Sequence, residues 1–157
     1  MARSAQFATT PAPTALPEHE TAPPRLRLAP GGGGRGVIDG GWWPRSRVAV
    51  TELTALVTAL AEPSDMITRV NVDFDDWDDV PLRITVLGHE VRVGWLAHLD
   101  HMIAVTRGHA DPTLLLVIPP AATPLSAEAA LARAAVETED VMPQEILASC
   151  DISTART

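Results

Sequence analysis

The stretch GVIDGGWWPRS, residues 36–46, is the part of the sequence around which we expect the fold to be organised. It holds two of the four tryptophans, Trp42 and Trp43, followed by a proline and an arginine. Adjacent residues of an extended segment point to opposite faces. One indole is therefore expected to enter the core while the other lies over the surface or lines a cleft. Pro44 fixes its own φ and favours an extended Trp43.

The residues around the tryptophans predict a bend. Val37 and Ile38 offer a short strand that the glycine pair at 40–41 would end, and the glycine run at 31–34 permits sharp turns. Ser46 is the expected N-cap of the helix that follows.

Two interpretations of this bend stay open. In the first, it is a corner that plugs the end of a sheet, with Arg45 paired to an acid. In the second, it is a ligand site with an aromatic wall, Arg45 as a planar anchor for an anion, and Asp39 as its partner or base. We favour the structural interpretation, because tryptophans serve packing as well as recognition.

Length and composition predict one domain. The chain has 157 residues, of which 46% are hydrophobic. Residues 1–23 are rich in alanine, threonine and proline without periodicity, which is typical of a disordered arm. We expect a single domain over residues 24–138, then a tail over 139–157 with a possible short helix at 143–148.

Charge and cysteine usage narrow the class of protein. The formal net charge is −8, which counts against general nucleic-acid binding, although residues 24–47 hold five arginines and one aspartate. We expect that basic segment to pack beside the acidic turn of the same chain. There is one cysteine, no apolar run of about 20 residues and no secretory core, so a cytoplasmic protein without a membrane span is predicted.

Two helices are indicated by the pattern. Between residues 49 and 61 the apolar positions Val50, Leu53, Val57 and Leu60 share one helical face, with Leu56 beside it. An alanine-rich helix is expected from Thr123-Pro124 or Ser126 to about 136, with one large buried anchor at 131.

The remaining periodic segments predict strands. Residues 25–28 and 103–105 read as short strands, and residues 68–74 alternate, with Thr68, Val70, Val72 and Phe74 inward. Residues 114–118 are continuously apolar, which indicates a central strand covered on both faces. Together these segments predict an α+β fold.

A hairpin over residues 82–95 is the clearest local pattern. A type II′ loop at Gly88-His89 would place Val86 opposite Val91 and leave His89 exposed. It would place Ile84 opposite Val93 and Leu82 opposite Trp95, with every apolar side chain on one face.

The fold class we predict is an antiparallel sheet of five or six strands packed against one amphipathic helix, with the alanine-rich helix after the last strand. A parallel doubly wound fold is not expected, because the connections within residues 67–118 are too short for crossovers.

Two polar segments invite a metal interpretation. Residues 73–79 hold five aspartates around Trp77, but the glycine and glutamate of a calcium-binding EF-hand loop are missing. We expect a solvated turn anchored by Trp77, with calcium or a basic partner surface as alternatives. His98 and His101 lie three residues apart in a connector, and zinc would require a further ligand. We predict no metal and no cofactor, and favour His101 if either histidine transfers protons.

Residues 36–46, the turn around Trp77 and the strand ending in Pro119-Pro120 resemble an actinobacterial domain family of unknown function. Its motif is GWWPRS after an acid–glycine pair, and the match covers roughly residues 24–138. The resemblance implies one compact domain and carries no activity.

The sequence thus predicts a small non-enzymatic binding domain that docks a protein or a small anionic ligand. The candidate ligand-binding residues are Asp39, Trp42, Trp43, Arg45, Trp77 and His101. The alternative is an enzyme with Asp39 or His101 as acid–base residue and Arg45 as substrate anchor. No nucleophile elbow or phosphate loop supports it. Single-stranded nucleic-acid binding is a third, disfavoured possibility.

Overall fold

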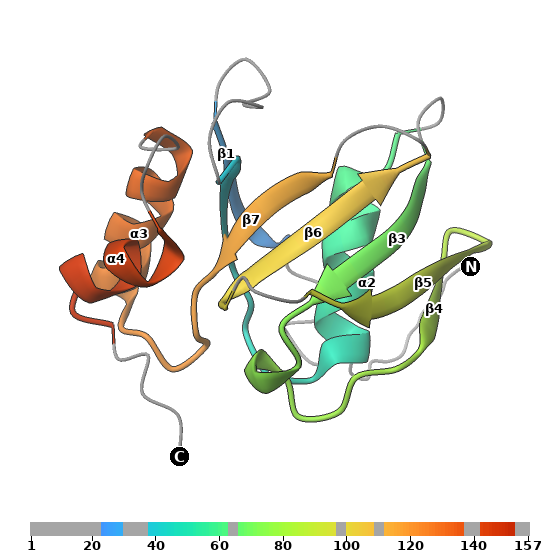
Figure 1. The fold of residues 1–157 in the computed structure, drawn as a ribbon, viewed down its shortest axis with the longest axis horizontal. Coiled ribbons are helices and arrows are strands. Elements are labelled where there is room, and N and C mark those ends of the chain that lie inside the picture. The colour runs from blue at the N-terminus through green and yellow to red at the C-terminus, as the bar shows by residue number, and fades with distance from the viewer. Residues whose placement is uncertain are drawn as a thin grey trace, which may run out of the picture.

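A seven-stranded mixed sheet carries helices on both faces (Figure 1). The computed structural model describes residues 23–29, 38–62, 66–96, 100–108, 112–136 and 142–152. The strands are β1 Arg25–Leu28, β2 Gly40–Trp43, β3 Ile67–Val72, β4 Arg83–Val86, β5 His89–Trp95, β6 Met102–Arg107 and β7 Thr113–Val117. The helices are α2 Ala49–Leu60, α3 Pro124–Val136 and α4 Pro143–Ser149, with the 3-10 turn η4 at Phe74–Asp76.

The strand order is β1-β2-β7-β6-β3-β5-β4, and two of the neighbouring pairs, β2 with β7 and β3 with β5, are parallel. The α+β class is confirmed, but the antiparallel sheet of five or six strands is wrong in count and in pairing. The error arose because a short connection shows how two consecutive strands can pair, but not which other strands lie beside them. Residues 73–82 lead the chain from β3 past the position next to it in the sheet. That position is taken by β5, and β4 becomes an edge strand.

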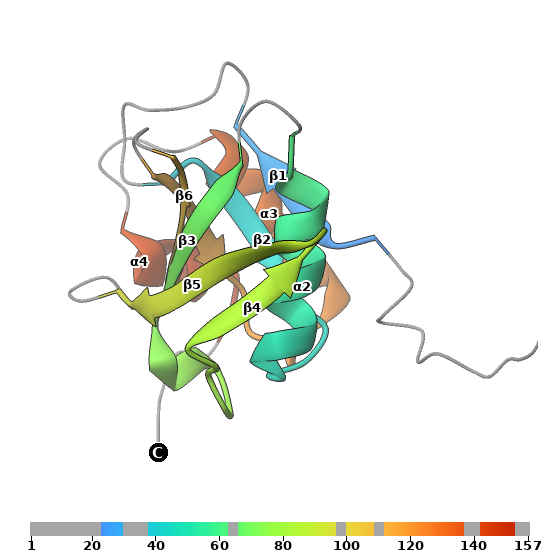
Figure 2. The same ribbon diagram turned by 90° about the vertical axis from the view of Figure 1, so that its right-hand side faces the viewer.

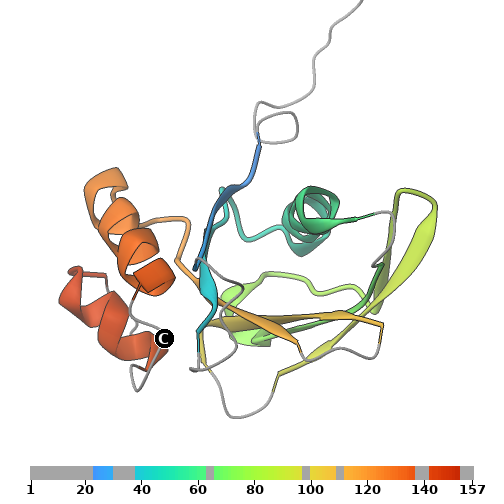
Figure 3. The ribbon, with the colours of Figure 1, turned by 90° about the horizontal axis from the view of Figure 1, so that it is seen from above.

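The sheet separates two hydrophobic cores. Figure 3 shows the sheet curving around α2 on one side, with α3 and α4 on the other. The α2 core contains Trp42, Ala49, Leu53, Leu56, Val57, Leu60, Ile67, Val70, Val72, Trp77, Ile84, Val86, Val91, Val93, Ile103, Val105, Leu115 and Val117. The α3–α4 core contains Ile38, Trp43, Met102, Leu116, Ile118, Ala127, Ala130, Leu131, Ala134, Ile146, Leu147, Cys150 and Ile152.

The position of β7 between the two cores explains why its sequence is continuously apolar. Leu115 and Val117 enter the α2 core, whereas Leu116 and the following Ile118 enter the α3–α4 core. The prediction of a central strand covered on both faces is confirmed.

Helix α2 buries most of the predicted stripe, but its start differs from the expectation. Leu53 and Val57 are buried, whereas Val50 is exposed because Ala49 turns to the sheet in its place. The N-cap is Val48, so the prediction that Ser46 caps the helix is wrong. The Ser46 hydroxyl instead accepts a hydrogen bond from the Val48 amide.

The strand predicted over residues 68–74 ends earlier. A register shift between Ile67 and Arg69 turns Ile67 inward and leaves Thr68 exposed. Phe74 is also exposed, because the chain enters η4 directly after Asp73. The inward positions expected for Thr68 and Phe74 are therefore wrong, while those of Val70 and Val72 are confirmed.

The β4–β5 hairpin forms with its register moved by two residues. Val86 pairs with His89 and Ile84 with Val91, so the turn is at Leu87-Gly88. Both turn residues have positive φ, 52° and 81°, as a type I′ turn requires. A shift of two keeps each side chain on its face, so the apolar pairs stay buried. The predicted II′ loop and its partners are wrong.

The flanks of the hairpin also differ from the expectation. Leu82 and Trp95 lie beyond the paired residues, and both are exposed rather than inward. His89 is exposed, as expected, but it is the first residue of β5.

The C-terminal helices pack on the face opposite α2. The alanine-rich helix is confirmed as α3, where the Thr123 hydroxyl accepts a hydrogen bond from the Ser126 amide and Leu131 is the large anchor. The short helix in the C-terminal segment is α4, which buries Ile146 and Leu147. The domain boundaries remain predictions.

Several expectations fall outside the described residues: those for the arm over 1–22, the glycine run and His98. Among the helices of the described part of the chain, none has the length and apolarity to cross a bilayer.

Gly40 gives a direct test of the β1–β2 register. A Cβ at this position would lie 2.3 Å from the Arg27 carbonyl oxygen, which is backbone and cannot move aside. We expect Gly40→Ala to lower the free energy of unfolding by about 3 kcal/mol in denaturant titrations. At Gly94 the nearest atom, at 2.6 Å, is the side-chain oxygen of Asn71, which can rotate. Gly94→Ala should cost less than about 1 kcal/mol, and equal losses would contradict this register.

Candidate functional site

The two tryptophans of the bend face opposite cores. Trp42 lies in the α2 core with its ring centroid 5.5 Å from that of Trp77. Trp43 lies in the α3–α4 core, and its indole Nε1 donates to the Pro119 carbonyl oxygen at 3.1 Å. The opposite orientation is confirmed, but neither indole lies on the surface or in a cleft, because both faces of the sheet are covered. The glycines at 40–41, expected to end a strand, instead begin β2.

Arg25 supports the bend from β1. Its guanidinium carbon lies 3.5 Å from the centroid of the Trp43 ring. Its Nε donates to the Trp43 carbonyl oxygen and its Nη2 to that of Pro44, each at 3.0 Å. Burial, and secondly the positive charge of Arg45, lower the pKa of Arg25. Arg25 was predicted only as part of a short strand over residues 25–28, with no contact to the bend.

Glu52, in the first turn of α2, contacts the C-terminal part of the bend. Its carboxylate accepts hydrogen bonds from the Arg45 amide at 3.1 Å and the Ser46 hydroxyl at 2.8 Å. Only 4% of Glu52 is exposed. The structural interpretation expected an acid paired with Arg45, and Glu52 contacts Arg45 through its backbone amide.

Asp39 lies at the far end of β2 from Arg45. Its Oδ2 accepts from the Leu114 amide at 2.8 Å, and its own amide donates to the Leu114 carbonyl oxygen at 2.7 Å. Asp39 therefore fastens the start of β7. The four residues of β2 span roughly 13 Å, so Asp39 and Arg45 do not share one pocket.

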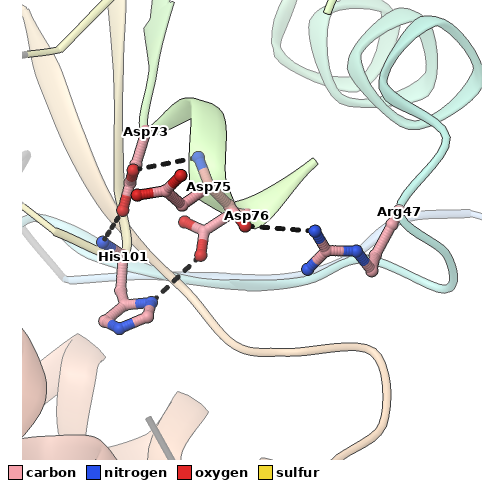
Figure 4. A network of polar contacts seen from close by, with 5 residues as sticks. All are labelled: Arg47, Asp73, Asp75, Asp76 and His101. Carbon is pink, nitrogen blue, oxygen red and sulfur yellow. Dashed lines mark hydrogen bonds and ion pairs between the residues drawn. The ribbon is translucent and has the colours of Figure 1, made fainter. Parts of the chain in front are cut away.

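A buried polar network forms where β3 ends and β6 begins (Figure 4). Asp73 follows β3, Asp76 lies in η4, and His101 precedes β6. Asp73 Oδ2 accepts from the His101 amide at 2.9 Å, and Asp76 Oδ1 lies 3.0 Å from His101 Nδ1. Asp73 and His101 are buried, and the Asp76 side chain is 11% exposed.

The network is tied to the chain on both sides. The Val117 amide donates to the His101 carbonyl oxygen, and His101 holds a positive φ of 62°. Arg47 donates to the Asp75 carbonyl oxygen and to Asp78 Oδ1, which fastens the turn to the segment before α2. The expected packing of the basic segment beside the acidic turn is present in this contact.

The aspartates of residues 73–79 thus divide into two groups. Asp75, Asp78 and Asp79 are exposed, as a solvated turn predicts. Asp73 and Asp76 are turned inward, so a fully solvated turn is wrong for these two. Trp77 is buried and anchors the turn, as predicted.

A separate cavity lies between the C-terminal half of α2 and the β4–β5 hairpin, which pack together in Figure 2. Its volume is about 330 Å³. The lining residues are Val57, Thr58, Ala61, Glu62, Met66, Ile67, Val86, Leu87, His89 and Val91. Of the apolar stripe predicted for α2, Val57 lines this cavity. The cavity itself could not be predicted, because it depends on how the hairpin crosses α2.

The fold and these sites define a small α+β domain with one apolar cavity and one buried Asp–Asp–His network among its described residues. The model of a family of unknown function, DUF5994, matches residues 25–134, and the chain belongs to this family. No curated protein and no solved structure matches the chain.

Glu52 provides a test of how the bend is held. Replacing it with alanine leaves the Arg45 amide and the Ser46 hydroxyl without their acceptor. We expect Glu52→Ala to lower the free energy of unfolding by at least about 2 kcal/mol in denaturant titrations. Glu128→Ala removes only an exposed ion pair with Arg27 and should cost less than about 1 kcal/mol. Similar losses in both variants would refute this role.

Proposed function

We propose that this chain is a non-enzymatic binding domain that takes a small apolar ligand in the cavity between α2 and the β4–β5 hairpin. The cavity's volume of about 330 Å³ falls within the range of small-molecule sites. The ligand would carry one polar end, because exposed polar side chains occur only at the rim.

The lining supports this ligand class. The floor is formed by the buried side chains of Val57, Val86 and Val91. At the rim, Glu62 and His89 are exposed and can hydrogen-bond a polar group. An apolar body on the floor with its polar end at the rim would remove apolar surface from water without burying an unsatisfied polar atom.

Leu87 carries the proposal. It occupies the first turn position of the hairpin with φ at 52°, where a leucine costs about 1–2 kcal/mol relative to its ordinary conformation. Asparagine or glycine suits this position better. Leu87 is 68% exposed, so its side chain gains little from packing within the chain. Its place on the cavity lining supplies a reason for a strained, exposed leucine, which is contact with a ligand.

The geometry of the other candidates moves the proposed site away from the bend. Trp42, Trp43 and Trp77 are buried, so an aromatic docking surface there would require the cores to open. Asp39 is engaged by the backbone of Leu114. These contacts also count against the enzymatic alternative based on Asp39.

Filling the cavity tests the proposal. We expect the protein to bind one equivalent of the apolar fluorophore 1-anilinonaphthalene-8-sulfonate, with displacement by 1-octanol. Ala61→Phe places a ring against the lining and should weaken fluorophore binding at least tenfold. Ala59→Phe, at an exposed position in the last turn of α2, is the matched control and should bind normally. Equal affinities for both variants, with circular dichroism showing each folded, would exclude this cavity as the site.

Leu87→Asn separates stability from binding. Asparagine tolerates positive φ, so we expect the free energy of unfolding to rise by about 1 kcal/mol. The same change removes apolar contact at the rim, so fluorophore affinity should fall several-fold. A variant that is more stable and binds with unchanged affinity would show that Leu87 does not serve ligand binding.

A further inference from the structure

We infer that Asp73, Asp76 and His101 form a binding site for a divalent first-row transition-metal ion, of which zinc is the ion to test. The inference is independent of the apolar cavity, because none of these residues lines it. It concerns the network in Figure 4, where a carboxylate-rich turn meets a histidine from a different segment.

The three side chains converge closely enough to share one ion. One ligand atom from each residue lies within 4.8 Å of the others. His101 Nδ1 and Asp76 Oδ1 are 3.0 Å apart. Ligand bonds to zinc are about 2.0–2.2 Å long, which places neighbouring ligand atoms roughly 3–4 Å apart. His101 Nδ1 and Asp76 Oδ1 are therefore already as far apart as two ligands of one zinc ion, and a small side-chain movement would bring a carboxylate oxygen of Asp73 to the same ion.

The imidazole distinguishes this cluster from an ordinary acidic turn. Exposed aspartates are common without an ion, but His101 is 7% exposed, comes from another segment, and points a ring nitrogen at Asp76 (Figure 4). A site with one nitrogen and two oxygen donors suits a first-row transition ion, since imidazole favours zinc and iron whereas magnesium and calcium prefer oxygen alone.

Charge also favours a cation at this place. Two carboxylates carry two negative charges, and a dication complements both of them. Carboxylate oxygens are ordinary zinc ligands beside an imidazole nitrogen. The bonds from the Asp75 and His101 amides to Asp73 would then orient the ligand.

The competing explanation is a plain His101–Asp76 ion pair that fastens β6 to η4. The two explanations differ in a measurable way. An ion pair needs no metal, and adding metal would leave the His101 ring unchanged. A metal site binds one ion per chain and changes the environment of Nδ1 directly.

The decisive experiment titrates the full-length protein, stripped of metal with EDTA and dialysed, with Zn²⁺ by isothermal titration calorimetry. We expect one equivalent to bind with micromolar or tighter affinity. Co²⁺ substitution should give visible ligand-field absorption. Asp76→Asn and His101→Asn should each weaken binding at least 100-fold, asparagine being chosen at 101 because it tolerates positive φ. Asp75→Asn and Asp78→Asn, exposed on the same turn, are matched controls and should bind normally.

A second measurement needs no variant to fold. In ¹⁵N-labelled wild-type protein, Zn²⁺ should shift the side-chain Nδ1 resonance of His101 by tens of parts per million. Absence of one-to-one binding, unchanged affinity in Asp76→Asn, or an unmoved His101 Nδ1 resonance would each overturn the site. Each of these results would leave the ion-pair explanation.

Discussion

The opposed burial of Trp42 and Trp43 is the constraint on which the rest of the structure depends. One short strand sends its two largest side chains into different cores, so β2 belongs to both layers at once. Each indole is then fixed separately, by the ring of Trp77 on one face and by the Pro119 carbonyl oxygen on the other. Arg25 and Glu52 hold the backbone of the bend between them. The segment that looked from its composition like a binding surface has both of its indoles buried.

Features with a local cause could be predicted from the sequence. The α2 stripe, the two-sided β7 and the alanine-rich α3 each follow from a pattern within one segment. The predictions for β7 and α3 hold, and the α2 stripe holds except at Val50, which is exposed. Strand partners could not be predicted in the same way. Whether β3 lies beside β4 or β5 depends on how residues 73–82 cross over, and no pattern inside either strand records it. The hairpin register failed for a subtler reason: two registers that differ by two residues bury the same side chains. The choice between them rests on a turn conformation that Leu87 does not favour.

The candidate sites were only half visible for a similar reason. The aspartates of residues 73–79 were set aside because they do not match an EF-hand loop, and the histidine at 101 because zinc would need a further ligand. The fold brings these residues together by placing η4 against the start of β6. The apolar cavity had no sequence signal of its own, since its lining combines core residues and exposed ones that come together only once the hairpin lies across α2. Arg25 and Glu52 were likewise missed, because Arg25 contacts the backbone of a different strand and Glu52 folds back from α2 onto the preceding bend.

The parallel pairing of β2 with β7 has a consequence for how the chain is made. The partner of Gly41 in the sheet is Leu116, so the first tryptophan pair emerges from the ribosome long before the strand that shelters it exists. At ordinary elongation rates of about 5–20 residues per second, both indoles stay in contact with solvent or chaperones for several seconds. The burial of both indoles must therefore follow the synthesis of β7. Tryptophan fluorescence would report this burial as a late event.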